Sequence, residues 1–92
     1  MEIDLRFFAT YRDAVGQKER TRTVADRATV GDVLADLEND YDGLDERLLA
    51  DGTIRPQLSV LKNGRNVMHM DGAETTLDDG DVVSVFPPVA GG

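Results

Sequence analysis

Three parts of this sequence carry groups that could take part in chemistry, and two of them can be set aside. His69 is the single histidine, and three aspartates gather at Asp78, Asp79 and Asp81. A histidine can act as a general base, but without a cysteine or an evident partner it is more typical of a strand or turn. The aspartates lack the spacing and the terminal glutamate of a calcium-binding EF-hand loop, and Asp-Gly sequences are typical of turns. We therefore expect no metal site and no catalytic residue at either place.

The third part is the C-terminal segment, and it has the most unusual composition. It reads Phe86-Pro87-Pro88-Val89-Ala90-Gly91-Gly92. Its two prolines cannot donate hydrogen bonds to a neighbouring strand, and they favour an extended conformation. At about 3.1 Å per residue, the last six residues would then reach about 18 Å from the folded domain. A glycine backbone passes a narrow channel and leaves its carbonyl open to attack. We expect residues 87–92 to form a tail that partners recognise, although termini are also commonly frayed and inert.

The composition excludes further classes of function. The chain has no cysteine, so disulfides, thiolate nucleophiles, iron–sulfur clusters and cysteine-ligated zinc are ruled out. Gly16, Gly31 and Gly43 are too scattered for a phosphate-binding loop. We expect the chain to bind no nucleotide and no other cofactor itself.

The charge points away from nucleic acids and membranes. Eighteen acidic and ten basic residues give a net charge of −8 and an isoelectric point near 4.4, which repels phosphate backbones and anionic lipids. The acidic excess, with arginine far more frequent than lysine, is typical of proteins adapted to high salt, although codon bias would give the same ratio. No apolar run approaches the ~18 residues of a membrane span, and no secretory signal is evident, so a cytoplasmic location is expected.

The length and the apolar pattern predict one small domain. The chain has 92 residues, too few for two cores. Residues 2–8 alternate apolar and polar as a half-buried strand does, with Phe8 breaking the alternation and facing the opposite side. Residues 9–18 are interpreted as a loop, and residues 19–24 as a polar edge strand.

A single helix and three further strands are expected beyond residue 28. Thr29 and Asp32 form a capping-box pattern before an apolar stripe that ends near Gly43. Residues 42–57 are interpreted as a connection with local helix. Three more strands follow, at residues 58–62, 65–70 and 82–86, with Asn63-Gly64 as a hairpin turn between the first two.

This order of elements predicts an α+β fold. A single amphipathic helix must cover one face of a mixed sheet of about four to five strands, with the first and last strands central and adjacent. That topology is the β-grasp, or ubiquitin-like roll. We expect residues 1–86 to form the β-grasp domain and residues 87–92 the tail.

The sequence resembles a known family over essentially its whole length. The residues that carry the resemblance are Phe7-Phe8-Ala9 with Arg12, Val15 and Gly16, Thr29-Val30, Asn63-Gly64, Leu77 to Asp81, and the tail from Phe86 to Gly92. The family contains the small subunit of molybdopterin synthase, the thiamin sulfur carrier and the ubiquitin-like small archaeal modifier proteins.

The resemblance implies that this chain is a substrate and not an enzyme, with the Gly92 carboxylate as its reactive group. A ubiquitin-activating-type (E1-like) enzyme would use ATP to join Gly92 to AMP, and sulfur transfer would then give a thiocarboxylate. The tail could deliver sulfur to a pterin precursor in the large subunit of molybdopterin synthase. Alternatively, a lysine of a target protein could attack Gly92 to give an isopeptide bond, which a deconjugating protease could cleave.

Two rival interpretations remain open. The chain could be a dedicated small subunit of molybdopterin synthase with no conjugation role. It could also be a β-grasp interaction module with an inert tail.

The domain body supplies candidate contact residues. Strand parity places Phe8 and Phe86 on the sheet face away from the helix, with Leu61 as a third member of an apolar patch beside the tail, although ordinary sheet packing would also explain these residues. Lys18 and Lys62 are the only lysines, and are therefore the candidate acceptors if copies of the chain become linked to one another.

Overall fold

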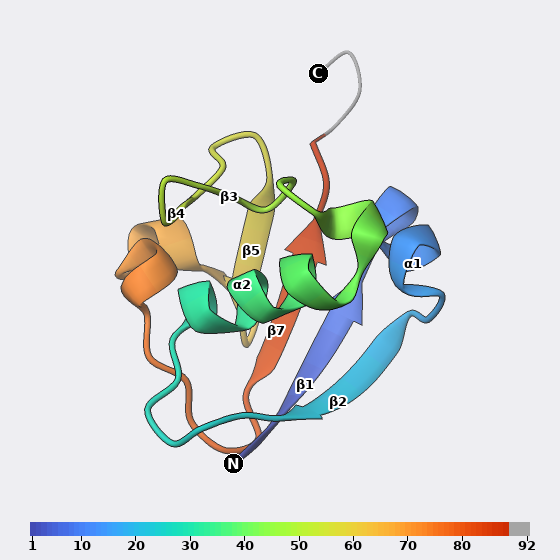
Figure 1. The fold of residues 1–92 in the computed structure, drawn as a ribbon. Coiled ribbons are helices and arrows are strands. Elements are labelled where there is room, and N and C mark those ends of the chain that lie inside the picture. The colour runs from blue at the N-terminus through green and yellow to red at the C-terminus, as the bar shows by residue number, and fades with distance from the viewer. Residues whose placement is uncertain (89–92) are drawn as a thin grey trace.

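The computed structural model describes residues 1–88, and its main element is a five-stranded mixed sheet (Figure 1). The strand order is β2-β1-β7-β5-β6. The strands are β1 (Glu2–Phe7), β2 (Glu19–Thr23), β5 (Ser59–Lys62), β6 (Arg65–Asn66) and β7 (Val82–Phe86). This confirms the predicted β-grasp with its edge strand β2.

The first and last strands lie side by side in the centre of the sheet, as predicted. β1 and β7 run parallel, with Leu5 opposite Val83 and Phe7 opposite Val85. Every other pairing in this sheet is antiparallel. The parallel pair allows the chain to begin and to leave the domain from opposite ends of the sheet.

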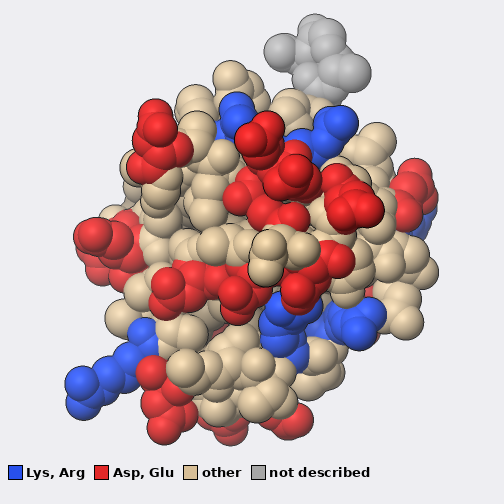
Figure 2. All heavy atoms as spheres, in the orientation of Figure 1, with Lys and Arg blue, Asp and Glu red and all other residues tan. Residues whose placement is uncertain are grey.

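Helix α2 (Val30–Asp40) covers one face of the sheet. Its predicted capping box is present: the Thr29 hydroxyl accepts from the Asp32 N–H at 3.1 Å, and the Asp32 carboxylate accepts from the Thr29 N–H at 3.0 Å. Such a cap satisfies N–H groups that the first turn leaves unpaired. Figure 2 shows several acidic side chains gathered over the outer side of this helix, with uncharged surface between them.

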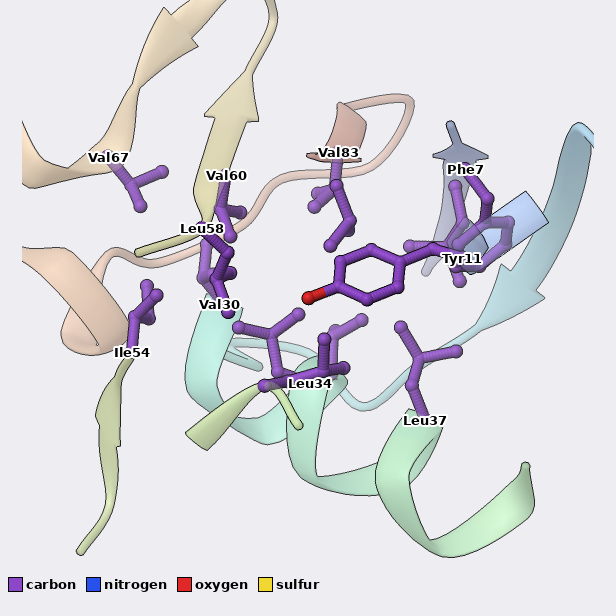
Figure 3. Close-up of a cluster of buried hydrophobic side chains, with 14 of the residues drawn as sticks. Phe7, Tyr11, Val30, Leu34, Leu37, Ile54, Leu58, Val60, Val67 and Val83 are labelled. Atoms are coloured by element: carbon purple, nitrogen blue, oxygen red, sulfur yellow. The ribbon is translucent and has the colours of Figure 1, made fainter. Parts of the chain in front are cut away.

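One apolar core fills the space between α2 and the sheet (Figure 3). The α2 side chains Val30, Val33, Leu34 and Leu37 are fully buried. The largest buried side chains of the sheet come from the central strands, namely Ile3, Leu5, Phe7, Val60, Val83 and Val85. The alternation predicted for β1 and β7 therefore determines which side chains face the helix.

The predicted loop at residues 9–18 is wrong, because a second helix occupies most of it. Helix α1 (Ala9–Val15) ends at Gly16, whose φ of 84° suits glycine. Tyr11 reaches from α1 into the core, and its burial stabilises a helix of only seven residues. The helix has no side-chain N-cap, so its start lacks a capping-box pattern like that of α2.

The predicted strand at 65–70 is also wrong after Asn66. The Asn66 side chain accepts from the Met68 N–H at 2.9 Å and begins the 3₁₀ helix η2 (Val67–His69). Val67 is fully buried. A further 3₁₀ helix, η3 (Gly72–Glu74), follows before the chain enters β7.

The segment 42–57 has the expected local helix, η1 (Asp42–Leu44), and a hairpin that was not predicted. Strands β3 (Leu49–Ala50) and β4 (Thr53–Ile54) pair across a two-residue turn, Asp51-Gly52, with φ values of 53° and 80°. Positive φ at both positions is the geometry that Asp-Gly favours in a tight hairpin. None of the helices in residues 1–88 is long and apolar enough to cross a membrane.

Candidate functional site: the open sheet face and the end of β7

The open face of the sheet, on the side away from α2, carries the predicted aromatic residues. In β7, Val83 and Val85 are buried against the helix, whereas Ser84 and Phe86 are half-buried on the open face. The parity predicted for Phe86 is therefore confirmed.

Phe8 and Phe86 lie against each other on this face. Their ring centroids are 4.1 Å apart and the rings are nearly parallel, at 9°. Phe8 follows β1 with extended backbone (φ −128°, ψ 150°), so its side chain points to the face opposite that of Phe7, as predicted. The pairing of Phe7 with Val85 brings Phe8 beside Phe86. The stacked pair is typically worth ~0.5–1.5 kcal/mol beyond the area it buries.

Leu61 belongs to the same face but to the neighbouring strand. It is half-buried, whereas the adjacent Val60 is buried on the helix side. In the register of β5 with β7, Ser59 lies opposite Phe86 and Leu61 lies opposite Ser84. Leu61 is thus diagonal to Phe86, a spacing that long side chains can bridge. The three predicted patch residues share one face across three adjacent strands.

The tail begins directly at the end of β7. Pro87 is half-buried and Pro88 is exposed, and neither belongs to a strand. The other predicted tail residues, Val89, Ala90, Gly91 and the reactive Gly92, lie outside the described residues. The Phe8–Phe86 stack therefore lies immediately before the segment expected to carry the chemistry.

The two lysines lie in different environments. The Lys62 ammonium donates to the Thr76 carbonyl at 3.0 Å and lies 3.5 Å from the Asp81 carboxylate, and its side chain is only 16% exposed. Lys18 is exposed after helix α1. Of the two candidate acceptors, Lys18 presents the freer amine.

Asp81 holds the Asn63-Gly64 turn against the start of β7. Its carboxylate accepts from the Asn63 side-chain amide at 2.9 Å and from the Asp78 N–H at 2.7 Å. Burial raises the pKa of Asp81, but these hydrogen bonds and the nearby Lys62 charge outweigh it and hold the pKa below its usual value. The acidic cluster therefore has a structural role at Asp81.

The remaining sequence candidates do not come together. His69 is exposed at the end of η2. Asp79 accepts from the Glu2 N–H at 2.7 Å and so joins the turn before β7 to the first strand. Within residues 1–88, no three histidine or acidic side chains lie close enough to hold a metal ion.

An open cavity of about 440 Å³ lies at the base of the tail, and sequence reasoning missed it. Its lining includes Tyr11 from α1, Arg47 and Arg55 from the two sides of the β3–β4 hairpin, and Pro87 and Pro88. Burial raises the pKa of the Tyr11 phenol, while the charges of Arg47 and Arg55 oppose that shift. No local pattern links these positions, because the fold alone brings them together.

The geometry of a β-grasp domain whose last strand leads directly into Pro87 and Pro88 agrees with a family comparison. A model of the ThiS family matches residues 5–92. The chain belongs to the ThiS family.

ThiS-family relatives include both modifiers and carriers by name. Small archaeal modifier protein 3 of Haloferax volcanii is 64% identical over 92 residues, covering 100% of both chains. Sulfur carrier protein CysO of Mycobacterium tuberculosis is 37% identical over 67 residues, which cover 70% of this chain and 72% of that protein. A relative from Haloferax also agrees with the adaptation to high salt that the acidic composition indicates. This ThiS-family chain is therefore a small ubiquitin-like protein of the modifier and sulfur-carrier kind.

Solved structures confirm the fold. The crystal structure of SAMP1 from Haloferax volcanii matches with a TM-score of 0.84 at 29% identity over 100% of both chains. A chain of the Amycolatopsis orientalis BexX/CysO complex matches with a TM-score of 0.78 at 27% identity, covering 98% of this chain and 99% of that one. A chain of the complex of molybdopterin-converting factor subunits 1 and 2 from Helicobacter pylori matches with a TM-score of 0.62 at 26% identity over 100% of both.

Proposed function

We propose that this chain is a ubiquitin-like modifier and sulfur carrier whose reactive group is the Gly92 carboxylate. The observation that carries the proposal is the end of β7: the central strand runs past the Phe8–Phe86 stack directly into Pro87 and Pro88. The segment that ends in Gly91-Gly92 thus starts beside an apolar surface that a partner can bind. The family match, which extends through residue 92, supports a role for that end.

The proposed chemistry starts with activation by another protein. A carboxylate is a poor electrophile, so an oxygen of Gly92 would attack the α-phosphorus of ATP in an E1-like adenylating enzyme and release pyrophosphate. A sulfide-level sulfur nucleophile would then displace AMP and leave a thiocarboxylate. Alternatively, a lysine amine of a target would displace AMP and form an isopeptide bond. In both cases ATP is bound by the partner, and this chain contributes no catalytic residue.

The apolar patch of Phe8, Leu61 and Phe86 is the proposed docking surface for these partners. Apolar side chains at the centre of an interface, with a charged rim, are typical of protein–protein contacts. Two structural relatives of this chain were solved in complexes, BexX/CysO and the molybdopterin-converting factor subunits. By analogy, the partners proposed here are the activating enzyme, a molybdopterin synthase large subunit, lysine-bearing targets and a deconjugating protease.

A narrower role is the second candidate. The similarity to a chain of the molybdopterin-converting factor complex favours a dedicated small subunit of molybdopterin synthase. In that case Gly92 would form the thiocarboxylate and never the isopeptide bond.

ATP-dependent pyrophosphate exchange tests the proposal. The activating enzyme of the same organism should catalyse exchange with the full chain but not with a chain that lacks Gly91 and Gly92. An isopeptide product would be sought with a protease other than trypsin, because no lysine or arginine follows Arg65 and trypsin would leave residues 66–92 on the target. Equal exchange with both chains, or none with either, would leave the inert interaction module as the better account.

A further inference from the structure

The cavity at the base of the tail differs in charge from the rest of this acidic protein. We call the surface formed by Tyr11, Arg47, Arg55, Pro87 and Pro88 the arginine cleft. We propose that the arginine cleft is a docking site for an acidic segment of the protein that receives the tail. This inference rests on the proposed function only in assuming that a partner takes up the tail.

The fold holds the two arginines in place from one hairpin. Arg47 precedes β3 and Arg55 follows β4, and the Arg55 N–H donates to the Leu48 carbonyl at 3.0 Å. The Glu38 carboxylate of α2 accepts from the N–H groups of Leu48 and Leu49 at 2.9 and 3.1 Å. The loop that carries Arg47 is therefore fixed to the main helix.

The guanidinium groups of the cleft have unused hydrogen-bonding capacity. Arg6 and Arg22 form ion pairs with carboxylates. Among residues 1–88 no ion pair joins Arg47 or Arg55 to a carboxylate, and the same holds for the other arginines, Arg12, Arg20, Arg27 and Arg65. Arg55 is half-buried, and its Nε atom, like that of Arg6, is buried without a hydrogen-bond partner in the described part of the chain. A buried donor without a partner is costly, so a movement of the Arg55 side chain that brought its Nε atom to an acceptor on a bound partner would be favoured.

The charge of the cleft favours an anion. Arg47 and Arg55 give two positive charges, and among the described residues of the lining Glu46 is the only acidic one, so this part of the surface is net positive in a chain of net charge −8. Figure 2 shows basic side chains at the end of the molecule where the C-terminal segment leaves, among many acidic ones. Arginine binds carboxylates through paired donors, and an ion pair to the half-buried Arg55 would be screened less by salt than one to the exposed Arg47.

The remaining lining favours a protein segment over a small phosphate ligand. Leu58, Pro87 and Pro88 provide apolar or ring surfaces beside the arginines, which suit a peptide better than a free ion. Glu46 repels a doubly charged phosphate more than a single carboxylate. Phe86 lies on the open face of the sheet, whereas the arginine cleft lies on the face that α2 covers. A partner that encloses Pro87 would therefore contact both the apolar patch and the arginine cleft.

Nuclear magnetic resonance titration tests the cleft without any partner enzyme. The probe is a short capped peptide of consecutive aspartate and glutamate residues, with the matching asparagine and glutamine peptide as its control. We expect the acidic peptide to shift the resonances of Arg47 and Arg55, and the control peptide and inorganic phosphate to shift them far less. Equal shifts with phosphate, or shifts spread evenly over the basic residues, would overturn the proposal.

Charge reversal tests the cleft in its proposed role. The double variant Arg47→Glu/Arg55→Glu should raise the KM for the chain in pyrophosphate exchange by about tenfold or more, with kcat retained, because close interfacial charge pairs are worth at least about 1.5 kcal/mol. The control Arg20→Glu/Arg65→Glu changes the net charge equally at two exposed arginines elsewhere and should have a much smaller effect. If the charge reversal impairs folding, the neutral double variant Arg47→Gln/Arg55→Gln takes its place in the same assay.

The possible failures are distinguishable. An unchanged KM in both double variants, with normal exchange by the unmodified chain, would refute the arginine cleft and leave the proposed function intact. No exchange by the unmodified chain would refute the proposed function, and the peptide titration would still decide whether the cleft binds acidic segments.

Discussion

Replacing Phe86 by alanine should separate docking from stability. Phe86 is half-buried and stacks on Phe8 at a centroid distance of 4.1 Å. The change removes a stacking contribution of ~0.5–1.5 kcal/mol and the burial of about half a side chain, roughly 1 kcal/mol. No enclosed cavity is left, because the ring lies on the open face. We therefore expect the free energy of unfolding to fall by about 1.5–2.5 kcal/mol.

Urea unfolding and pyrophosphate exchange measure the two effects. Phe7→Ala is the matched core control: Phe7 is 0% exposed, and its truncation should cost about 3–5 kcal/mol or unfold the domain. A double-mutant cycle of Phe8→Ala with Phe86→Ala should give a coupling energy of ~0.5–1.5 kcal/mol. Phe86→Ala should also raise the KM for the chain in exchange.

The reasoning would be refuted if Phe86→Ala destabilised the domain as much as Phe7→Ala while leaving the KM unchanged. That result would make Phe86 a core residue and not part of a docking surface.

Three further predictions concern Asp81, the lysines and the tail. Asp81→Asn should destabilise the domain at neutral pH by about 1–3 kcal/mol. The pKa of Asp81 is lowered in the folded state, so the difference in unfolding free energy between the variant and the unmodified chain should shrink as the pH falls below about 4. Urea unfolding measures this difference, and a constant value down to low pH would contradict the prediction. In the folded protein Lys18 should react several-fold faster than Lys62 with an amine-acylating reagent, as followed by peptide mass, and equal rates would show that Lys62 is free. Deletion of Gly91 and Gly92 should leave the melting temperature unchanged, and a large drop would mean that the segment is part of the folded domain.

Much of the fold could be predicted because its pattern is local and repeated. The alternation in residues 2–8 and 82–86 assigned the buried and open faces of the central strands, and the Thr29–Asp32 pair located the start of α2. Helix α1 was missed because its seven residues lack a side-chain cap. Only its packed Tyr11 and the glycine that ends it distinguish it from a loop.

The turn residues of the β3–β4 hairpin are enough to predict it. Asp51-Gly52 has the same turn chemistry as Asn63-Gly64, and both are positive-φ pairs in the structure. The strands of this hairpin are only two residues long, too short to show alternation. The turn residues were therefore the only guide.

The site shows the same division between local and long-range information. Strand parity was enough to place Phe8 and Phe86 on one face, but their contact depends on the parallel register of β1 with β7. The sequestration of Lys62 by Asp81 and Thr76 depends on segments that meet only in the folded chain. The same is true of Arg47 and Arg55 beside Pro87.

The mass of the chain purified from its own cells tests the central claim most directly. If Gly92 is handed to ATP-dependent chemistry in a partner, part of the population should carry sulfur in place of one carboxylate oxygen, or be joined through Gly92 to a lysine of another protein. A population found entirely as the free acid, under conditions in which the activating enzyme is present and active, would contradict it.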